Sequence, residues 1–387
     1  MPQVRDHSPA GLRSRPFWAL CLTFIVGCLS SISSPGQALT NMLASPVISN
    51  NVVHFNLLAP NAREVRLAGD WMPSGKTEPF TRGTNDAWTV AVAGLEPGIY
   101  IYNFTVDGLA IADPVNPAMK LRARTSASLL EIKSSSPEFW EARDVPHGTV
   151  KIRRHRAASM NGEWREFWVY TPPGYERSRK QYPTVYLLHG SNDTPAGWTQ
   201  VGRANFTLDN LIAEGRAREM VVVMPNGHAV PFTASRDEQR RNTEMMSGYV
   251  MNDLMPFVEK EYRVRKDRQA RAIAGFSMGG GHALEIGLAH LDRFSAICVF
   301  SAGFPRGFAQ RHRAVLENAE ATNKRLNLLW IGCGREDFAL EGSRELHRTL
   351  AARGIDHWHI ETDGAHTYNV WRQYFREIAP LLFVKLK

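Results

Sequence analysis

The sequence is poor in cysteine, and two of its four cysteines lie within the first forty residues. The other two, Cys298 and Cys333, stand in the apolar runs "AICVFS" and "LLWIGCG". Cysteines in such runs usually behave as small buried apolar side chains, so we expect two buried thiols. A fold built on disulfides is not expected, although an oxidising compartment would permit one bond between these two residues.

Sequence signatures of metal and phosphate chemistry are also missing. No "HExxH" zinc motif occurs, the histidines are scattered, and no glycine-rich loop is followed by Lys-Ser or Lys-Thr. The apolar run "FWALCLTFIVG" near the N-terminus is too short and too soon interrupted to cross a membrane comfortably. We therefore expect no metal, no cofactor and no transmembrane span.

Acidic residues are outnumbered by basic ones. The chain has 46 Lys and Arg against 38 Asp and Glu, which gives a formal net charge of +8 and a pI near 9.4. Such a surface favours anionic partners, for example acidic glycans or acidic small molecules. The basic residues form no dense run and are mixed with acids, so a solvated basic surface is the simpler interpretation. No nucleic-acid partner is expected.

Residues 1–38 have the layout of a secretory signal peptide. Arg5, Arg13 and Arg15 precede the apolar run, and small and turn-forming residues follow it in "CLSSISSPGQA". We predict an exported protein, secreted or periplasmic, with cleavage after Ala38. The letters "IVGC" also fit a bacterial lipoprotein box, in which Cys28 would carry a lipid anchor, so this second route stays open.

Residues 46–131 alternate short strand-like runs with turn signals and contain no convincing helical segment. In "DAWTVAVAGL" and "GIYIYNFTVDG" apolar residues recur at every second position. Turns are indicated at "APNA", "GDWMPSGK" and "VDG". A small all-β sandwich is the predicted fold. Residues 132–148, which carry Ser, Pro and mixed charge without a sustained period, are predicted to be a linker.

Residues 149–387 alternate strand and helix patterns. Short apolar runs such as "PTVYLLHG", "MVVVMPNG", "RAIAGFS" and "LNLLWIGCG" are separated mostly by helical stretches such as "FTLDNLIAEGRA" and "SRELHRTLAARG". This alternation predicts the α/β class, with a mostly parallel sheet flanked by helices on both faces.

The strongest local signal is the G-x-S-x-G motif in "AIAGFSMGGGHAL", formed by Gly275, Ser277 and Gly279. It stands between an apolar strand pattern and a helical run, which is the setting that a nucleophilic serine at a tight strand-to-helix turn requires. A glycine-rich turn without chemistry is the alternative. The flanking patterns favour Ser277 as a nucleophile.

A serine nucleophile needs a base and an acid that orients the base, and in this fold they follow it in the order acid, then histidine. Asp337 follows the strand "LNLLWIGCG", and His366 follows the strand "HWHIETDG". Both positions are just past the carboxyl ends of strands, where such sheets place their sites. Glu336 and Glu341 compete with Asp337, but the shorter side chain is the usual partner of histidine in a strand-exit turn.

Backbone amides are expected to stabilise the oxyanion that acyl transfer produces. The N–H of Met278 follows the nucleophile at a helix N-terminus, and the N–H of Ser191 follows "VYLLHG". We predict these two donors as the oxyanion hole, each worth roughly 3 kcal/mol in the transition state.

The α/β part resembles the esterase D-like group of α/β-hydrolases, in particular feruloyl and acetylxylan esterases of carbohydrate esterase family one. The resemblance covers about residues 149–385 and rests on "YPTVYLLHGSNDTPAGW", "GFSMGGGHAL", "CGREDF" and "DGAHTYNVWRQYF". It implies the α/β-hydrolase fold and the same nucleophile, acid and base. Trp198, Asn226 and Trp371 match recurring family positions near the cleft, which implies substrate binding.

The predicted N-terminal sandwich resembles immunoglobulin-like modules attached to glycan-active enzymes, through "VRLAGDW", "GIYIYNFTVDG" and "DPVNP". Such a module implies either glycan binding through exposed aromatics such as Trp71 or a packing role without sugar affinity. Tyr100, Tyr102 and Phe104 look like core residues.

The leader pattern predicts export, and the resemblances imply a serine esterase whose substrate is an ester-bearing carbohydrate or a small-molecule ester. Removal of feruloyl or acetyl groups from plant cell-wall polysaccharides such as xylan, through an acyl-enzyme on Ser277, is the leading hypothesis. A siderophore trilactone esterase and an acyltransferase of the same fold stay open. A glycan-binding protein with an inactive hydrolase part is disfavoured, because Ser277, Asp337 and His366 are all present.

Overall fold

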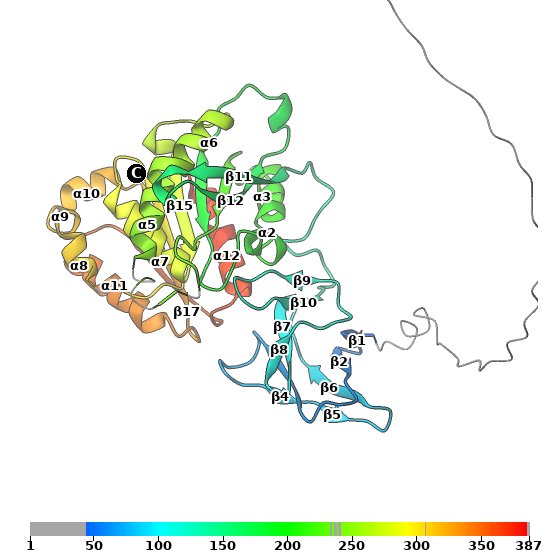
Figure 1. Cartoon of the computed structure of the whole chain (residues 1–387). Coiled ribbons are helices and arrows are strands. Elements are labelled where there is room, and N and C mark those ends of the chain that lie inside the picture. Colours follow the sequence, from blue (N-terminus) through cyan, green and yellow to red (C-terminus); the bar gives the residue numbers. More distant parts are fainter. Residues whose placement is uncertain (1–43, 233, 236–237, 239–240, 306, 385–387) are drawn as a thin grey trace, which may run out of the picture. The chain divides into compact units, whose positions relative to one another are not determined.

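The computed structural model describes residues 44–232, 234–235, 238, 241–305 and 307–384 (Figure 1). The predicted signal peptide, including Cys28 and the cleavage position at Ala38, lies outside these ranges. Among the described helices, none has both the length and the apolar character that a membrane crossing needs.

Residues 44–132 form two antiparallel sheets. The strand order is β1-β2-β6-β5 in the first sheet and β4-β3-β7-β10-β9 in the second, with β8 also paired to β7. The strands are β1 (Val47–Ser49), β2 (Val52–Leu58), β3 (Val65–Gly69), β4 (Glu78–Pro79), β5 (Thr81–Arg82), β6 (Ala87–Ala93), β7 (Gly98–Val106), β8 (Leu109–Ile111), β9 (Met119–Lys120) and β10 (Ala127–Ile132).

The core of this N-terminal β region is built by strand alternation. Val53, Phe55 and Leu57 are the buried positions of β2, since every second side chain of a strand points to the same face. The ring of Phe55 meets the edge of Tyr102 at 4.8 Å, and Tyr102 and Phe104 are fully buried. The prediction that β7 supplies core aromatics is confirmed.

Trp71, the aromatic residue for which sugar binding and packing were both left open, packs against neighbouring rings. It is half-buried, stacks on Phe55 at 6.0 Å and meets Tyr100 edge-on at 5.8 Å. The indole also covers Gly69, where an added Cβ would lie 2.3 Å from the ring. One face of the ring is therefore used in packing against Phe55.

Residues 149–384 contain an eight-stranded sheet of order β11-β12-β14-β13-β15-β16-β17-β18. Strands β11, β12 and β14 pair antiparallel, and from β14 to β18 the pairing is parallel. The bounds are β11 (Thr149–Ala157), β12 (Glu163–Thr171), β13 (Thr184–Leu188), β14 (Val221–Pro225), β15 (Arg271–Phe276), β16 (Ala296–Phe300), β17 (Leu328–Gly334) and β18 (Trp358–Thr362).

Helices cover both faces of this sheet (Figure 1), which confirms the predicted fold class of an α/β-hydrolase preceded by an all-β region. One layer includes α5 (Asn242–Tyr249), α6 (Met255–Glu261), α7 (Met278–Ala289), α8 (Phe308–Arg311), α9 (Arg313–Leu316), α10 (Ala319–Arg325) and α11 (Leu340–Ala352). The other includes α2 (Gly197–Gln200), α3 (Ala204–Ala213) and α12 (Tyr368–Ile378).

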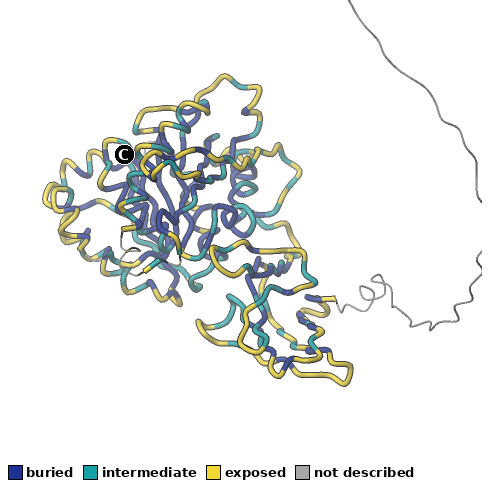
Figure 2. Tube along the Cα trace, in the orientation of Figure 1, coloured by how far each residue is buried: buried dark blue, intermediate teal, exposed yellow. Residues whose placement is uncertain are grey.

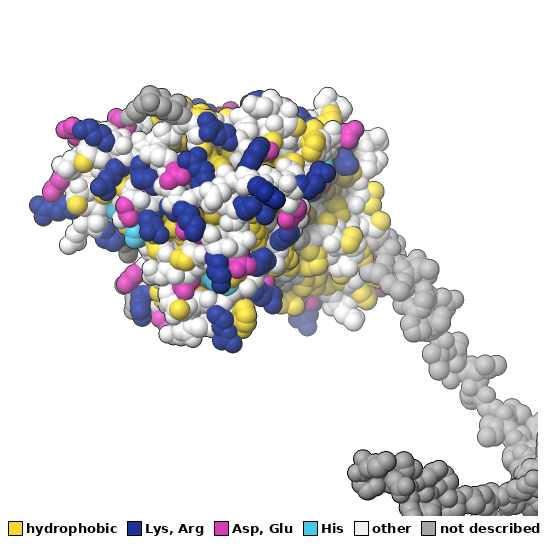
Figure 3. All heavy atoms as spheres, turned by 90° about the horizontal axis from the view of Figure 1, so that it is seen from above, with side chains coloured by type: hydrophobic (Ala, Val, Ile, Leu, Met, Phe, Trp, Pro, Cys, Tyr) yellow, Lys and Arg dark blue, Asp and Glu magenta, His cyan; other side chains and the backbone are white. Residues whose placement is uncertain are grey.

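Side chains of the central strands alternate between the two layers. In β13, Tyr186 and Leu188 join the core under α7, while Val185 and Leu187 join the core under α12. Because both faces are covered, the strands read as continuous apolar runs in the sequence. Buried residues are accordingly concentrated in these strands (Figure 2). On the face seen in Figure 3, Lys and Arg are interspersed with Asp and Glu.

The segment predicted as a linker has no helix or strand between residues 133 and 148, but it is packed. Trp140 is 3% exposed, and the Arg372 guanidinium lies 4.4 Å from its ring centroid. The Asn210 side-chain amide donates to the carbonyls of Phe139 and Glu141, at 2.9 Å each. The described residues from 44 to 384 accordingly belong to one compact unit.

The N-terminal β core generates a stability prediction. Phe55→Ala removes a fully buried ring that contacts three other aromatic rings, so the free energy of unfolding should fall by about 3–5 kcal/mol. Leu109→Ala, at a side chain that is 68% exposed, is the matched control and should change it by about 0.5 kcal/mol or less. Chemical denaturation measures both, and equal effects would contradict the assignment of this core.

Candidate active site

The chain turns from β15 into α7 within very little space. Ser277 has φ 55° and ψ −122°, a backbone conformation that L residues rarely adopt. A Cβ at Gly275 would lie 2.5 Å from the carbonyl oxygen of Gly279, and one at Gly279 would lie 2.5 Å from that of His189. The glycines of the motif are therefore required by close backbone approach, and they raise Ser277 above the sheet edge.

Ser277 stands at the N-terminus of α7. Its N–H donates to the carbonyl of Phe300 at 2.8 Å, which ties the turn to the neighbouring strand. Its hydroxyl makes no hydrogen bond to another residue in the described part of the chain, and it lines a pocket together with His366. The hydroxyl is thus free to rotate toward either the histidine or a bound substrate.

His366 and Asp337 meet across two adjacent strand ends. Strands β17 and β18 run parallel with Gly334 opposite Thr362, so the loops that follow them leave the sheet at the same edge. Nδ1 of His366 lies 2.9 Å from both carboxylate oxygens of Asp337. A proton on Nδ1 is held there by the carboxylate, which leaves Nε2 as the nitrogen able to accept a proton from a hydroxyl.

Asp337 is 4% exposed, and burial alone would raise the pKa of its carboxyl. Hydrogen bonds from His366, from the Ser301 hydroxyl and from the Ala339 N–H outweigh burial, so the pKa lies below its ordinary value. The carboxylate stays ionised at neutral pH. Ser301 also accepts a hydrogen bond from Trp371 Nε1 at 2.8 Å, which links the acid to the pocket wall.

The two competing glutamates have other partners. Glu336 accepts a hydrogen bond from the N–H of Gly364, and Glu341 forms an ion pair with Arg344 at 2.7 Å. Within the described ranges His366 has Asp337 as its one carboxylate partner. The structure therefore brings together the three residues selected from the sequence, although no hydrogen bond joins Ser277 to His366.

The loop after β13 approaches the nucleophile. A Cβ at Gly190 would lie 2.4 Å from the Phe276 ring, so only glycine fits there. His189 Nδ1 lies 2.8 Å from the Gly190 carbonyl, and its Nε2 accepts the Gly227 N–H at 2.9 Å. Burial lowers the pKa of His189 to about 4, so the ring is neutral and fixes the start of the loop.

The predicted oxyanion donors are the amides of Ser191, in this loop, and Met278, in the first turn of α7. Neither N–H donates to a backbone or side-chain acceptor among the residues that the structure describes. Unused amides at a helix N-terminus and in a tight loop are suited to bind developing negative charge.

The pocket around Ser277 has a volume of about 270 Å³. Its walls come from the motif turn, the loop after β13, the start of α12 and, unexpectedly, the N-terminal β region. The lining residues are Asp70, Ile101, Lys120, Arg122, Gly190, Ser191, Asn192, Asp193, Phe276, Ser277, His366, Thr367, Tyr368 and Trp371.

Of the three residues predicted to bind substrate, only Trp371 lines this pocket. Its ring stacks on Phe276 at 3.8 Å and meets His366 edge-on at 4.9 Å. Trp198 is fully buried and donates to the carbonyl of Leu188, so it supports the strand end and cannot reach a substrate. Asn226 lies outside the pocket lining, and its side chain accepts the His228 N–H at 3.0 Å.

Sequence reasoning missed several residues of this site. Phe338, next to the acid, is 77% exposed and its ring lies 4.2 Å from that of His366. Asp70, Lys120 and Arg122 come from a region more than 150 residues before the nucleophile, and no local motif marks them. Of these residues, Phe338 is the one that the sequence could have indicated, because a large apolar side chain directly follows Asp337.

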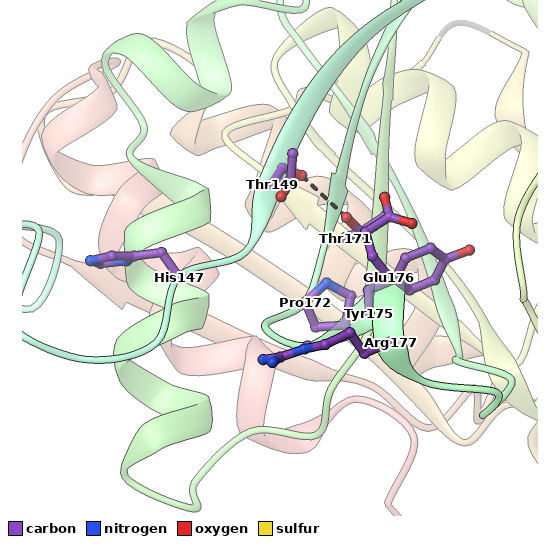
Figure 4. Close-up of a pocket in the computed structure, with 8 residues that line it drawn as sticks. His147, Thr149, Thr171, Pro172, Tyr175, Glu176 and Arg177 are labelled. Carbon is purple, nitrogen blue, oxygen red and sulfur yellow. Dashed lines mark hydrogen bonds between the residues drawn. The ribbon is translucent and has the colours of Figure 1, made fainter.

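A separate hollow of about 160 Å³ lies over the start of the large sheet (Figure 4). It is lined by His147, Thr149, Thr171, Pro172, Gly174, Tyr175, Glu176 and Arg177. None of these residues belongs to the pocket around Ser277. Thr171 Oγ1 donates to the Thr149 carbonyl at 3.4 Å, while His147 bonds to Asp209 and Glu176 pairs with Lys151, so these polar groups have partners within the protein.

Comparisons with known proteins agree on one family. The family model described as putative esterase matches residues 157–382. The chain is 26% identical over 344 residues to an endo-1,4-beta-xylanase/feruloyl esterase of Xylanibacter ruminicola. That match covers 87% of this chain but 45% of the relative, so the chain spans less than half of the relative's length.

Two solved structures show the same fold. A ferulic acid esterase of carbohydrate esterase family one from Anaeromyces mucronatus, solved with ferulic acid, is 23% identical, with a TM-score of 0.55 over 67% of this chain and 100% of that chain. The enterobactin esterase of Shigella flexneri is 18% identical, with a TM-score of 0.63 over 87% of this chain and 94% of that chain.

Replacement of Asp337, the predicted acid, is the most direct test of the site. Asp337→Asn keeps the size of the side chain but no longer holds the Nδ1 proton of His366, so kcat for 4-nitrophenyl acetate should fall by about 10⁴-fold. Glu336→Gln is the matched control, since Glu336 is adjacent in the chain and bonds only to Gly364. Steady-state kinetics give kcat for both variants. A larger loss of kcat in Glu336→Gln than in Asp337→Asn would assign the acid to Glu336.

Proposed function

Since the chain belongs to this family of esterases, we propose that it hydrolyses feruloyl or acetyl esters of plant cell-wall polysaccharide through an acyl-enzyme on Ser277. The observation that carries the proposal is the meeting of Ser277 and His366 in one pocket, with His366 bonded to Asp337 at 2.9 Å. A nucleophile, a base and an oriented acid are together the requirements for serine-dependent acyl transfer.

Acylation follows from the positions of these groups. Ser277 Oγ attacks the ester carbonyl carbon while His366 Nε2 takes the hydroxyl proton, and the carbonyl oxygen becomes an oxyanion held by the Ser191 and Met278 amides. Asp337 stabilises the imidazolium that results. The tetrahedral intermediate collapses, the bond to the alcohol oxygen breaks, and the alcohol leaves with the proton that His366 returns.

Deacylation repeats the same steps with water as the nucleophile. His366 takes a proton from the water while the water oxygen attacks the acyl carbon, and collapse of the second oxyanion breaks the bond to Ser277. The acid is released and the serine hydroxyl is restored. No group beyond those of the protein and the two substrates is needed.

The walls of the pocket support an aromatic acyl group. Phe276, Tyr368 and Trp371 line one side, and Ile101 of the N-terminal β region adds an apolar side chain. Aromatic rings in such pockets pack edge-on or offset against a bound ring. The relative that aligns over most of this chain is named a xylanase/feruloyl esterase, which supports the same acyl group and a polysaccharide substrate.

We place this activity outside the cytoplasm. The support is the layout of residues 1–38, in which arginines precede a short apolar run and a small-residue cleavage site. A polysaccharide of the plant cell wall is too large to enter a cell, so an enzyme acting on it must be exported. A lipid anchor at Cys28 would equally satisfy this requirement.

The proposed function is tested by the release of acids from methyl ferulate, feruloylated arabinoxylan and acetylated xylan, measured side by side. The wild-type protein should release ferulate or acetate, and Ser277→Ala should lose activity by about 10⁶-fold, since removal of the nucleophile disables the whole triad. Whether ferulate or acetate is released identifies the acyl group that the enzyme removes.

Labelling by a fluorophosphonate, which reacts with an activated serine, separates the possible failures. Normal labelling of Ser277 without release of either acid would contradict the cell-wall substrate and keep the triad, and enterobactin-type trilactones and acyl transfer to sugars would then be assayed. Absence of labelling in a folded protein would contradict the triad itself.

A further inference from the structure

The N-terminal β region contributes Asp70, Ile101, Lys120 and Arg122 to the pocket around Ser277, and the last two belong to a short segment, residues 120–124, at and after the end of β9. This segment lies against the loop of residues 190–194, which carries the Ser191 amide. The Ala123 N–H donates to the carbonyl of Asn192 at 3.3 Å, and the Arg124 N–H donates to its side-chain oxygen at 3.2 Å. The segment is therefore a fixed part of the pocket wall.

Arg122 lies in the middle of this fixed segment and lines the pocket with Ser277 and His366. It is partly buried, and it has neither an ion pair nor a hydrogen bond with any residue in the described ranges. Burial lowers the pKa of Arg122, against the opposing effects of Asp193 and Asp70. An arginine in a pocket without a partner has five donors available to a ligand.

Lys120 and Arg122 bring two cations to the pocket, and Asp193 and Asp70 are the acids beside them. Asp193 is committed to Lys120. Burial raises the pKa of Asp70 to about 7, against the opposing effects of the Ile101 amide and Arg122, so a large fraction of its carboxyl is neutral at neutral pH. Because neither acid forms an ion pair with Arg122, its positive charge is available to bind a ligand.

We propose that Arg122 forms a subsite for a carboxylate on the ester substrate. A carboxylate accepts two parallel N–H donors of a guanidinium, which is the strongest pairing this side chain makes. The net charge of +8 on the chain attracts such substrates toward the molecule. The inference rests on the proposed esterase activity. Feruloyl and acetyl groups have no free carboxylate in the ester, so within the proposed function the carboxylate lies on the sugar, whereas a carboxylate on the acyl side would identify a different acyl group.

The test uses pairs of esters that differ only in charge. One pair is methyl 4-carboxycinnamate and methyl 4-carbamoylcinnamate, which place the carboxylate on the acyl side. The other is chlorogenate and its methyl ester, which place it on the alcohol side. The wild type should prefer the carboxylate in one pair by about tenfold in kcat/KM, the expected size of a charged hydrogen bond.

Arg122→Gln should abolish the preference, because kcat/KM for the carboxylate ester falls more than kcat/KM for its neutral counterpart, and Arg122→Lys should keep part of the preference. Arg63→Gln, at an exposed arginine of the same region, controls for the loss of net charge. No preference in either pair, or a preference that survives Arg122→Gln, would overturn the subsite.

A failure of the proposed function does not obscure this result. Phosphonates that end in a carboxylate or in the matching carboxamide react with Ser277 whether or not cinnamoyl esters are hydrolysed. A faster reaction of the carboxylate form that depends on Arg122 supports the subsite, and equal rates contradict it.

A second inference rests on a different contact, the buried ion pair of Lys120 with Asp193. These side chains are 1% and 6% exposed, and they join β9 to the oxyanion loop. Asp193 also accepts hydrogen bonds from the Tyr368 hydroxyl at 2.7 Å and from the Thr194 N–H at 2.6 Å. Its own N–H donates to the Gly190 carbonyl at 3.3 Å.

Asp193 stands two residues after Ser191, so whatever fixes Asp193 also fixes the direction of the Ser191 amide. A buried carboxylate that loses its cation draws in water or moves toward solvent. We infer that Lys120 is a positioning residue, which acts through Asp193 to hold the oxyanion loop in its catalytic conformation. The N-terminal β region is in that case part of the esterase site.

Lys120→Met tests this role, with Arg203→Gln as the control. Arg203 pairs with Glu131 at 3.0 Å and also joins the N-terminal β region to the α/β region, but at a partly exposed place away from the loop. Lys120→Met should lower kcat and the rate of phosphonate labelling of Ser277 by about tenfold or more, with little change in KM, as expected for a displaced oxyanion donor. Lys120→Arg should recover part of the loss.

Labelling of Ser277 does not depend on which ester is the natural substrate, so this result stands apart from the proposed function. A folded Lys120→Met variant that labels at the rate of Arg203→Gln would overturn the positioning role. If Lys120→Met does not fold, Lys120→Met/Asp193→Asn leaves no buried charge and is used instead. Labelling of that variant at the wild-type rate would equally overturn the inference.

Discussion

The tight turn between β15 and α7 is the constraint on which the active site depends. Ser277 has a disfavoured backbone conformation that the surrounding structure enforces. The glycines on both sides of it are packed against the ends of β13 and α7. The same crowding requires glycine at position 190 and brings the oxyanion loop against Phe276. One steric constraint thus sets the positions of Ser277, of the loop that carries Ser191, and of the pocket wall at Phe276.

Several parts of this arrangement could be predicted because they depend on residues close in sequence or on strand ends. The G-x-S-x-G spacing predicts the turn at Ser277, since only small residues fit beside it. Asp337 and His366 follow from parallel strand order, because loops after neighbouring parallel strands must leave at one edge of the sheet. The α/β class follows from the alternation of continuous apolar runs with helical patterns.

Other parts could not be predicted, because they depend on which surfaces pack together. Trp198 and Asn226 match positions near the cleft, yet burial of one and local bonding of the other keep both from the pocket. Trp71 is a large aromatic in a turn-rich segment, but it covers Gly69. Lys120 and Arg122 show no local pattern, since their roles come from contact with a loop seventy residues later.

The packing of residues 133–148 has a consequence for how such a protein evolves. The segment joins the two regions through the buried Trp140 ring and through the carbonyls that Asn210 binds, so it does not act as a flexible tether. A gene fusion that exchanged residues 44–148 would have to supply matching partners for Asp193, Asn210 and Arg372 at once. The two regions are therefore expected to be inherited together, as one cooperative unit, and not as interchangeable modules.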